Sequence, residues 1–127
     1  MIERGIKGRS ETVVSQENVA LAMGSGELMV FATPAMIALA EKAAWTSVKD
    51  ALADGEGTVG SKMEMSHIAP TPIGKKVWCE SELLEIDRKR LVFKVTAFDE
   101  SGMIGEGMHE RFIINNEKFL RKANEKC

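Results

Sequence analysis

Cysteine and histidine are scarce in this sequence, with two of each among 127 residues. Cys79 lies inside a strand-like run and Cys127 ends the chain. This spacing fits neither a zinc site nor a disulfide framework, so we expect both cysteines to be reduced thiols. His67 and His109 lie in separate segments, each without a neighbouring cysteine. We therefore expect no metal site.

Long runs of one residue type are also missing. The chain has 17 basic and 19 acidic residues and a formal charge of −2, with no basic block. We therefore expect neither a nucleic acid nor an anionic membrane as a partner. No stretch approaches the roughly 18 apolar residues of a membrane span, and the N-terminal "MIERGIKGRS" has no apolar core of a signal peptide. A cytoplasmic location is expected.

What the sequence does contain is the composition of a globular protein, with 44% hydrophobic and 28% charged residues. Its length supports one hydrophobic core, so we expect a single domain over residues 1–127. No internal repeat, linker or low-complexity segment divides it. Any functional site must therefore share space with that core.

One long helix is predicted over residues 34–52. Thr33 suits the N-cap and Pro34 suits the first helical position. Apolar residues then recur at helical spacing. They are Met36, Ile37, Ala40, Ala44, Trp45, Val48 and Leu52.

The other segments read as strands. In "TVGSKMEMSH" the alternation puts Val59, Ser61, Met63, Met65 and His67 on one face. Further strands are predicted over residues 6–14, 76–86, 90–98 and 103–114, with short hairpin turns at "DRKR" and "DESG". A last short helix would be capped by Asn115 or Asn116. One strand, one helix and four strands in antiparallel succession predict an α+β fold in which the helix covers one face of a sheet.

Two polar residues interrupt the apolar faces of these elements. Glu41 is four residues from both Ile37 and Trp45, which puts all three on one helix face and points the carboxylate toward the core. The alternative is a helix rotated so that Glu41 lies at the edge of the apolar stripe. His67 closes the apolar face of its strand, either as a hydrogen-bonded rim residue or as half of a site with Glu41.

Four further residues carry weaker signals. Thr33 is either an ordinary cap or a hydroxyl beside helix N–H groups that stabilise an oxyanion. Gly60 marks a bulge, a close approach of backbone to ligand, or a packing requirement. His109 and Arg111 share a strand face, either as an exposed pair that meets phosphates or as a solvated surface pair.

The combination of three motifs resembles the hotdog-fold thioesterases of the fluoroacetyl-CoA thioesterase-like family. These motifs are "FAT" at the helix start with a glutamate eight residues later, "VG" followed by "SHIAPTPIG", and the closing "IGEGMHER". The resemblance runs over residues 30–119. It implies a curved antiparallel sheet wrapped around one long helix, in a homodimer with active sites at the subunit interface.

The resemblance also implies hydrolysis of a short acyl-coenzyme A, without a cofactor, by Thr33, Glu41 and His67. Glu41 would act as base or nucleophile, while Gly60 and Arg111 would line the acyl pocket. The member specialised for fluoroacetyl-CoA has aromatic lid residues where this chain has "GSGELM", so we expect acceptance of short and medium acyl chains instead. The alternative function is a non-catalytic protein that binds acyl-CoA or another small ligand. A hotdog hydratase is disfavoured because its Asp-then-His spacing on one element is missing.

Overall fold

The computed structural model describes residues 1–126, so the predicted thiol of Cys127 lies outside the described residues. The strands are β1 (Lys7–Val13), β2 (Glu56–His67), β3 (Lys76–Asp87), β4 (Arg90–Asp99) and β5 (Gly102–Asn115). The helices are α1 (Ala20–Met23), α2 (Thr33–Val48) and α3 (Asn116–Asn124), and the 3-10 turn η1 (Lys49–Ala51) extends α2. The long helix and all five predicted strands are thus confirmed.

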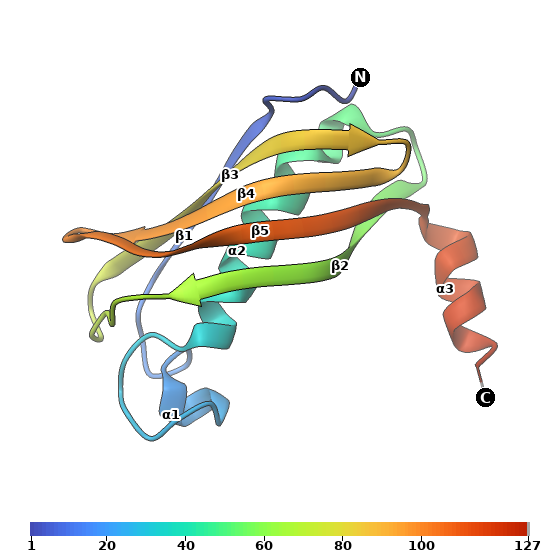
Figure 1. The fold of residues 1–127 in the computed structure, drawn as a ribbon. Coiled ribbons are helices and arrows are strands. Elements are labelled where there is room, and N and C mark those ends of the chain that lie inside the picture. The colour runs from blue at the N-terminus through green and yellow to red at the C-terminus, as the bar shows by residue number, and fades with distance from the viewer. Residues whose placement is uncertain (127) are drawn as a thin grey trace.

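The strands form one antiparallel sheet in the order β1-β3-β4-β5-β2 (Figure 1). The predicted succession of four strands is correct only for β3, β4 and β5, because β2 pairs with β5 and not with β3. Residues 68–75, which contain Pro70 and Pro72, carry the chain from one edge of this meander to the other. Within this crossover, Thr71 is buried and donates a hydrogen bond of 2.7 Å to Asp99.

Helix α2 covers one face of the curled sheet, as the α+β prediction requires (Figure 1). Its buried residues are Met36, Leu39, Ala40, Ala43, Ala44 and Val48. The sheet contributes residues such as Val77, Leu83, Leu91, Phe93 and Val95 to the same core. Strand β1 approaches the helix so closely that a Cβ on Gly8 would lie 2.2 Å from the carbonyl oxygen of Ala43. Glycine at position 8 is what permits this contact.

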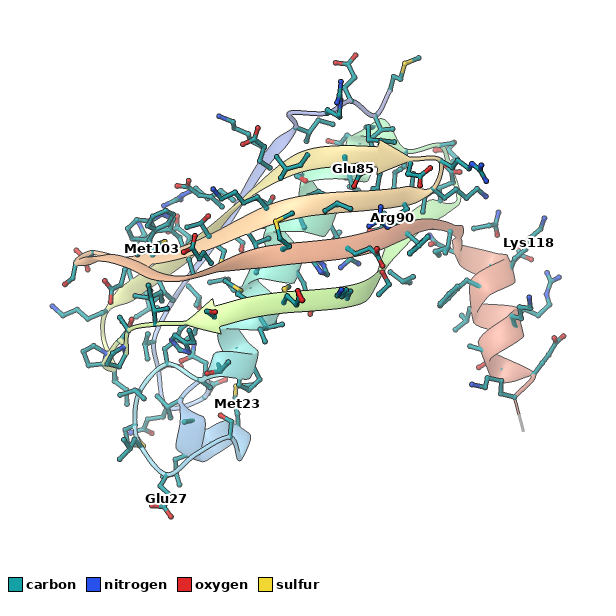
Figure 2. All side chains as sticks on the ribbon, in the orientation of Figure 1. Met23, Glu27, Glu85, Arg90, Met103 and Lys118 are labelled. Carbon is teal, nitrogen blue, oxygen red and sulfur yellow. The ribbon has the colours of Figure 1, made fainter. Side chains whose placement is uncertain are left out.

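The opposite face of the sheet meets solvent and carries charged pairs. Figure 2 shows Glu85 and Arg90 close to the β3–β4 hairpin, and their side chains form an ion pair of 3.4 Å. Arg90 also donates a hydrogen bond to Glu110 on β5. An antiparallel sheet with one buried and one solvated face is common. An enclosed site therefore has to use the α2 side or an edge of the sheet.

The two ends of the molecule carry the short helices. Helix α1, which the sequence patterns did not predict, lies in the loop between β1 and α2, and Figure 2 places Met23 and Glu27 there, far from Lys118 of α3. The predicted cap of α3 is confirmed, because the side chain of Asn115 accepts a hydrogen bond of 3.0 Å from the backbone N–H of Lys118. Across residues 1–126, the helices are too short or too polar to cross a membrane.

Candidate active site

A β-bulge in β2 decides which side chains face α2. The pairing register of β2 with β5 shifts between Gly60 and Lys62, so Ser61 is the extra residue. A bulge reverses the alternation of side chains on either side of it. The predicted face is therefore wrong for Val59 and Ser61, and Gly60 takes their place beside Met63 on the α2 side.

Thr33 begins α2, but it is not the N-cap that the sequence predicted. Ala32 holds the cap position with an extended backbone, and no side chain caps the first turn. The hydroxyl Oγ1 of Thr33 instead forms a hydrogen bond of 2.8 Å with Nδ1 of His67, at the end of β2. The structure thus brings together two of the predicted site residues.

The environment of His67 favours a neutral imidazole. Burial lowers the pKa of His67, against a smaller opposing effect from the backbone of Ala69, so the ring is uncharged at neutral pH. Its second nitrogen, Nε2, is buried and has no hydrogen-bond partner within residues 1–126. A neutral imidazole with one nitrogen fixed by a hydroxyl is suited to proton transfer at the other.

A hollow of about 300 Å³ lies against Thr33 and His67. Phe31, Ile68 and Ala20 of α1 contribute apolar surface to its lining. The site therefore combines polar groups on one side with an apolar wall, which is typical of pockets for small organic ligands.

Glu41 lies in a second group of residues, separate from Thr33 and His67. Its side chain is 40% exposed, so the alternative in which Glu41 lies at the edge of the apolar stripe is the correct one. Glu41 lies eight positions after Thr33 in the α-helix, which is about 12 Å along the axis. The prediction that Glu41 faces His67 therefore fails within one chain, where the carboxylate forms no hydrogen bond with described residues and lies 3.9 Å from Nη1 of Arg111.

Arg111 and His109 are buried, with 6% and 1% of their surfaces exposed, which corrects the prediction of an exposed basic pair. Their burial is tolerated because their polar atoms have partners. Arg111 donates from Nε to Oγ1 of Thr58 at 2.8 Å and from Nη2 to the Thr58 carbonyl at 2.9 Å. Arg111 Nη1 lies 3.1 Å from Nε2 of His109, whose Nδ1 is 2.8 Å from the carbonyl of Lys62.

Gly60 completes this second group by leaving space for it. A Cβ on Gly60 would lie 2.9 Å from Oε2 of Glu41, 3.2 Å from His109 and 3.4 Å from Nη1 of Arg111. The carboxylate, the guanidinium and the imidazole therefore converge on the backbone of Gly60. Two groups, one around Thr33 and one around Glu41, thus lie along β2.

Comparison with known proteins identifies the family of this chain. The model of the fluoroacetyl-CoA-specific thioesterase family matches residues 14–117. The chain belongs to the fluoroacetyl-CoA-specific thioesterase family. A curated member, the fluoroacetyl-CoA thioesterase of Streptantibioticus cattleyicolor, is 39% identical over 97 residues, which cover 76% of this chain and 70% of that protein. The family resemblance predicted from the sequence is confirmed.

Solved structures support the same assignment. A solved structure of FlK, a fluoroacetyl-CoA thioesterase, matches with a TM-score of 0.93 and 32% identity, covering 100% of this chain and 98% of FlK. A FlK variant solved with fluoroacetate and CoA matches with a TM-score of 0.87 and 31% identity, covering 93% and 99% of the two chains. A hot-dog-like protein from Thermanaerovibrio acidaminovorans, 21% identical with a TM-score of 0.89, covers 98% and 93% and supports the fold. The predicted hotdog fold is confirmed.

Within this thioesterase family fold, one contributor to the site was missed by reasoning from the sequence. Thr58 holds two donors of Arg111, yet nothing in "GTVG" marks it as more than a strand residue. The available signal was its spacing of two from Gly60, which puts both on one strand face. The burial of His109 was missed because its partner, the carbonyl of Lys62, lies in another strand.

Proposed function

We propose that this protein hydrolyses the thioester of a short or medium acyl-coenzyme A. The observation that carries the proposal is the hydrogen bond of 2.8 Å between Thr33 and His67, beside a hollow at the start of α2. Membership of a thioesterase family supports the same reaction, as does the binding of fluoroacetate and CoA by a FlK variant. Coenzyme A enters as part of the substrate, and the reaction needs no cofactor.

The first turn of α2 supplies the site for the thioester carbonyl. Because no side chain caps this turn, its N–H groups stay available to a ligand. The positive end of the helix dipole favours the negative charge that develops on the carbonyl oxygen. Thr33 lies at the same place, where its single hydroxyl proton is donated to Nδ1 of His67, so the backbone N–H groups are the donors to the carbonyl oxygen.

Glu41 supplies the oxygen nucleophile by one of two routes. As a base, it takes a proton from water while the water oxygen adds to the carbonyl carbon. As a nucleophile, its carboxylate adds to that carbon, and water later hydrolyses the resulting anhydride. In both routes the C–S bond breaks with its electron pair on sulfur, and the products are a carboxylic acid and the free thiol of coenzyme A.

His67 donates a hydrogen bond to the departing sulfur. When Nδ1 accepts the hydrogen bond of Thr33, the ring proton lies on Nε2. This nitrogen has no partner within residues 1–126, so its N–H is free to donate to the sulfur. The thiolate is protonated with a proton of the consumed water, which Glu41 takes up in the first route and the hydrolysis of the anhydride releases in the second, so the imidazole stays neutral throughout.

A homodimer would join the two groups that one chain keeps apart. Strand β2 is an edge strand with an unpaired side, and it carries both Gly60 and His67. Antiparallel pairing of two β2 edges about a two-fold axis near the middle of the strand would bring the Gly60 end of one chain beside the His67 end of the other. Glu41, which lies against Gly60, then approaches Thr33 and His67 of the partner subunit.

A panel of acyl-coenzyme A esters with a thiol reagent tests the function. We expect release of free coenzyme A by the wild-type protein and loss of this release in Glu41→Gln. Glu80→Gln is the matched control, because Glu80 is an exposed carboxylate on the outward face of β3. Tight binding of acyl-CoA without release of thiol would reject hydrolysis and support the non-catalytic alternative.

Rapid quenching distinguishes the two routes proposed for Glu41, as a base and as a nucleophile. Mass spectrometry of the protein during a single turnover detects an added acyl group on Glu41 if the carboxylate attacks directly. Its absence, together with a solvent isotope effect on turnover, supports the route through water.

A further inference from the structure

His109 makes two hydrogen bonds that together fix one neutral form of its ring. The carbonyl of Lys62 can only accept, so Nδ1, at 2.8 Å from it, must carry a proton. The guanidinium of Arg111 can only donate, so Nε2, at 3.1 Å from Nη1, must carry a lone pair. Both requirements are met by the same neutral tautomer. The ring therefore acts as a donor to the backbone and as an acceptor for Arg111.

The surroundings keep His109 in this neutral form. Burial is the main cause that lowers the pKa of His109, and the positive charge of Arg111 lowers it further. The carbonyl of Lys62 and the carboxylates of Glu41 and Glu110 oppose this shift. A charged imidazolium would place a proton on Nε2, directly against a guanidinium donor.

Arg111 is thereby held at three of its donor positions. Nε and Nη2 bind Thr58, and Nη1 binds His109. The two partners lie on different strands, so the plane of the guanidinium cannot rotate without breaking one of them. Nη1 also lies 3.9 Å from Oε2 of Glu41.

Glu41 depends on this arrangement for its orientation. Its side chain is 40% exposed and is attached to a helix face that packs only at its edge. Within residues 1–126, Arg111 is the cationic group that forms an ion pair with it. The backbone of Gly60 lies beside the same carboxylate oxygen, where a Cβ would be 2.9 Å from Oε2 and 3.4 Å from Nη1 of Arg111.

We infer that His109 is a positioning residue, which holds Arg111 through its neutral ring so that the guanidinium orients the carboxylate of Glu41 for reaction. The inference rests on the proposed function, because it assigns His109 to the same thioesterase site. His109 does not touch the reacting atoms. Its Nδ1 is bound to the Lys62 carbonyl of β2 and its Nε2 to Arg111. The ring therefore keeps Arg111, and with it the carboxylate of Glu41, in a fixed position relative to the β2 backbone.

A role in packing alone makes different predictions. The ring of His109 also lies 6.3 Å from that of Phe93, centroid to centroid, and fills space in the core. For a residue that only fills space, His109→Phe would preserve function and His109→Gln would impair it. For a positioning residue the order reverses, because Gln keeps an oxygen that accepts from Arg111 and Phe keeps only the ring.

Steady-state kinetics of these two variants form the main test. We expect His109→Phe to lower kcat by about tenfold to a hundredfold with little change in KM, since misplacing a reactive group by about 1 Å costs that much. His109→Gln should retain most of kcat. Thr58→Val, which removes the partner of Nε and keeps the side-chain shape, should lower kcat in the same direction if His109→Phe does not fold. Unchanged kcat in folded His109→Phe, or equal losses in the Phe and Gln variants, would overturn the inference.

Nitrogen NMR of the full-length protein tests the arrangement without any turnover. We expect the neutral Nδ1-protonated tautomer for His109 at neutral pH, and a slowly exchanging Nη1–H signal for Arg111 that persists in His109→Gln and is lost in His109→Phe. An Nε2-protonated or doubly protonated ring would overturn the inference. If the wild type hydrolyses no acyl-CoA and yet shows these signals, the proposed function fails while the geometry assigned to His109 stands.

Discussion

The carboxylate of Glu41 fills the space that a side chain at position 60 would take, since a Cβ on Gly60 would lie 2.9 Å from Oε2. Gly60 has no left-handed backbone, so a larger residue is excluded by this neighbour and not by strain. The far end of a glutamate can move aside at little cost. A substitution here therefore moves Glu41 more than it disturbs the fold.

Gly60→Ala should lower kcat by about tenfold or more, because the carboxylate is displaced from its place beside Arg111. The free energy of unfolding should change by less than about 1 kcal/mol. Kinetics and urea denaturation measure the two effects. A folded Gly60→Ala variant with wild-type kcat would show that position 60 does not act through Glu41.

Glu41→Ala should separate activity from stability. Turnover should fall to background, whereas the free energy of unfolding should change by less than about 1 kcal/mol, because the side chain is half-exposed and its ion pair with Arg111 is long. Thermal unfolding and thiol release on the same samples measure both. Near-normal turnover in this variant would make Glu41 a structural residue.

Mixing two inactive variants should restore activity if the site is shared between subunits. In a mixed dimer of Glu41→Ala and Thr33→Ala chains, one site keeps Thr33 from one chain and Glu41 from the other, and random exchange predicts about a quarter of wild-type activity. Sedimentation should show a dimer at micromolar concentration. A monomer, or mixed samples that stay inactive, would place the whole site in one chain.

Acyl specificity should be broad, because the segment before "VFAT" lacks aromatic residues. The side chains of Leu21, Met23, Leu28 and Met29 are exposed around α1, and Gly24 and Gly26 separate them. Flexible aliphatic side chains discriminate small apolar differences by only about 1–3 kcal/mol. We expect kcat/KM for fluoroacetyl-, acetyl-, propionyl- and branched acyl-CoA to lie within about a hundredfold of one another. A larger preference for the fluorinated substrate would contradict an open pocket.

The free energy of unfolding should fall when the pH drops below the pKa of a free histidine side chain. The pKa values of His67 and His109 are lowered from 6.5, mainly by burial, so the unfolded chain takes up protons before the folded chain does. The free energy of unfolding is therefore constant above this value and decreases as the pH falls from it toward the lowered values. Urea midpoints from about pH 8 to about pH 5 measure the slope. His109→Gln should flatten it, and an unchanged slope would locate the effect elsewhere.

Local patterns in the sequence were sufficient to predict the long helix and the strands but not how the strands pair. The spacing of Met36, Ala40 and Ala44 predicted α2, and alternation predicted the strands. The pairing of β2 with β5 joins segments such as Ser61 and Glu110, which are 49 residues apart. A local pattern carries no information on which of several strands pairs at such a distance.

The candidate site shows the same limit. Glu41 and His67 could be selected because each interrupts an apolar face, and Thr33 because it suits a helix cap. The bulge at Ser61 determines what Glu41 meets, and the sequence marked a bulge at Gly60 only as one of three alternatives. The burial of His109 and Arg111 depends on acceptors supplied by β2. Polar groups whose partners come from another strand look like surface residues until the sheet is assembled.

The crossover that carries the chain from β2 to β3 also sets an order of folding. Strand β2 has β5 as its neighbour in the sheet, so during synthesis it stays unpaired until residues 102–115 have left the ribosome. Pairing over such sequence distances is slow, and an unpaired strand is a template for aggregation in the meantime. The charged residues Lys62 and Glu64 near its middle are of the kind that discourage wrong pairing. Truncation within β5 would therefore affect more than a C-terminal strand, because β2, which carries Gly60 and His67, would lose the strand with which it pairs.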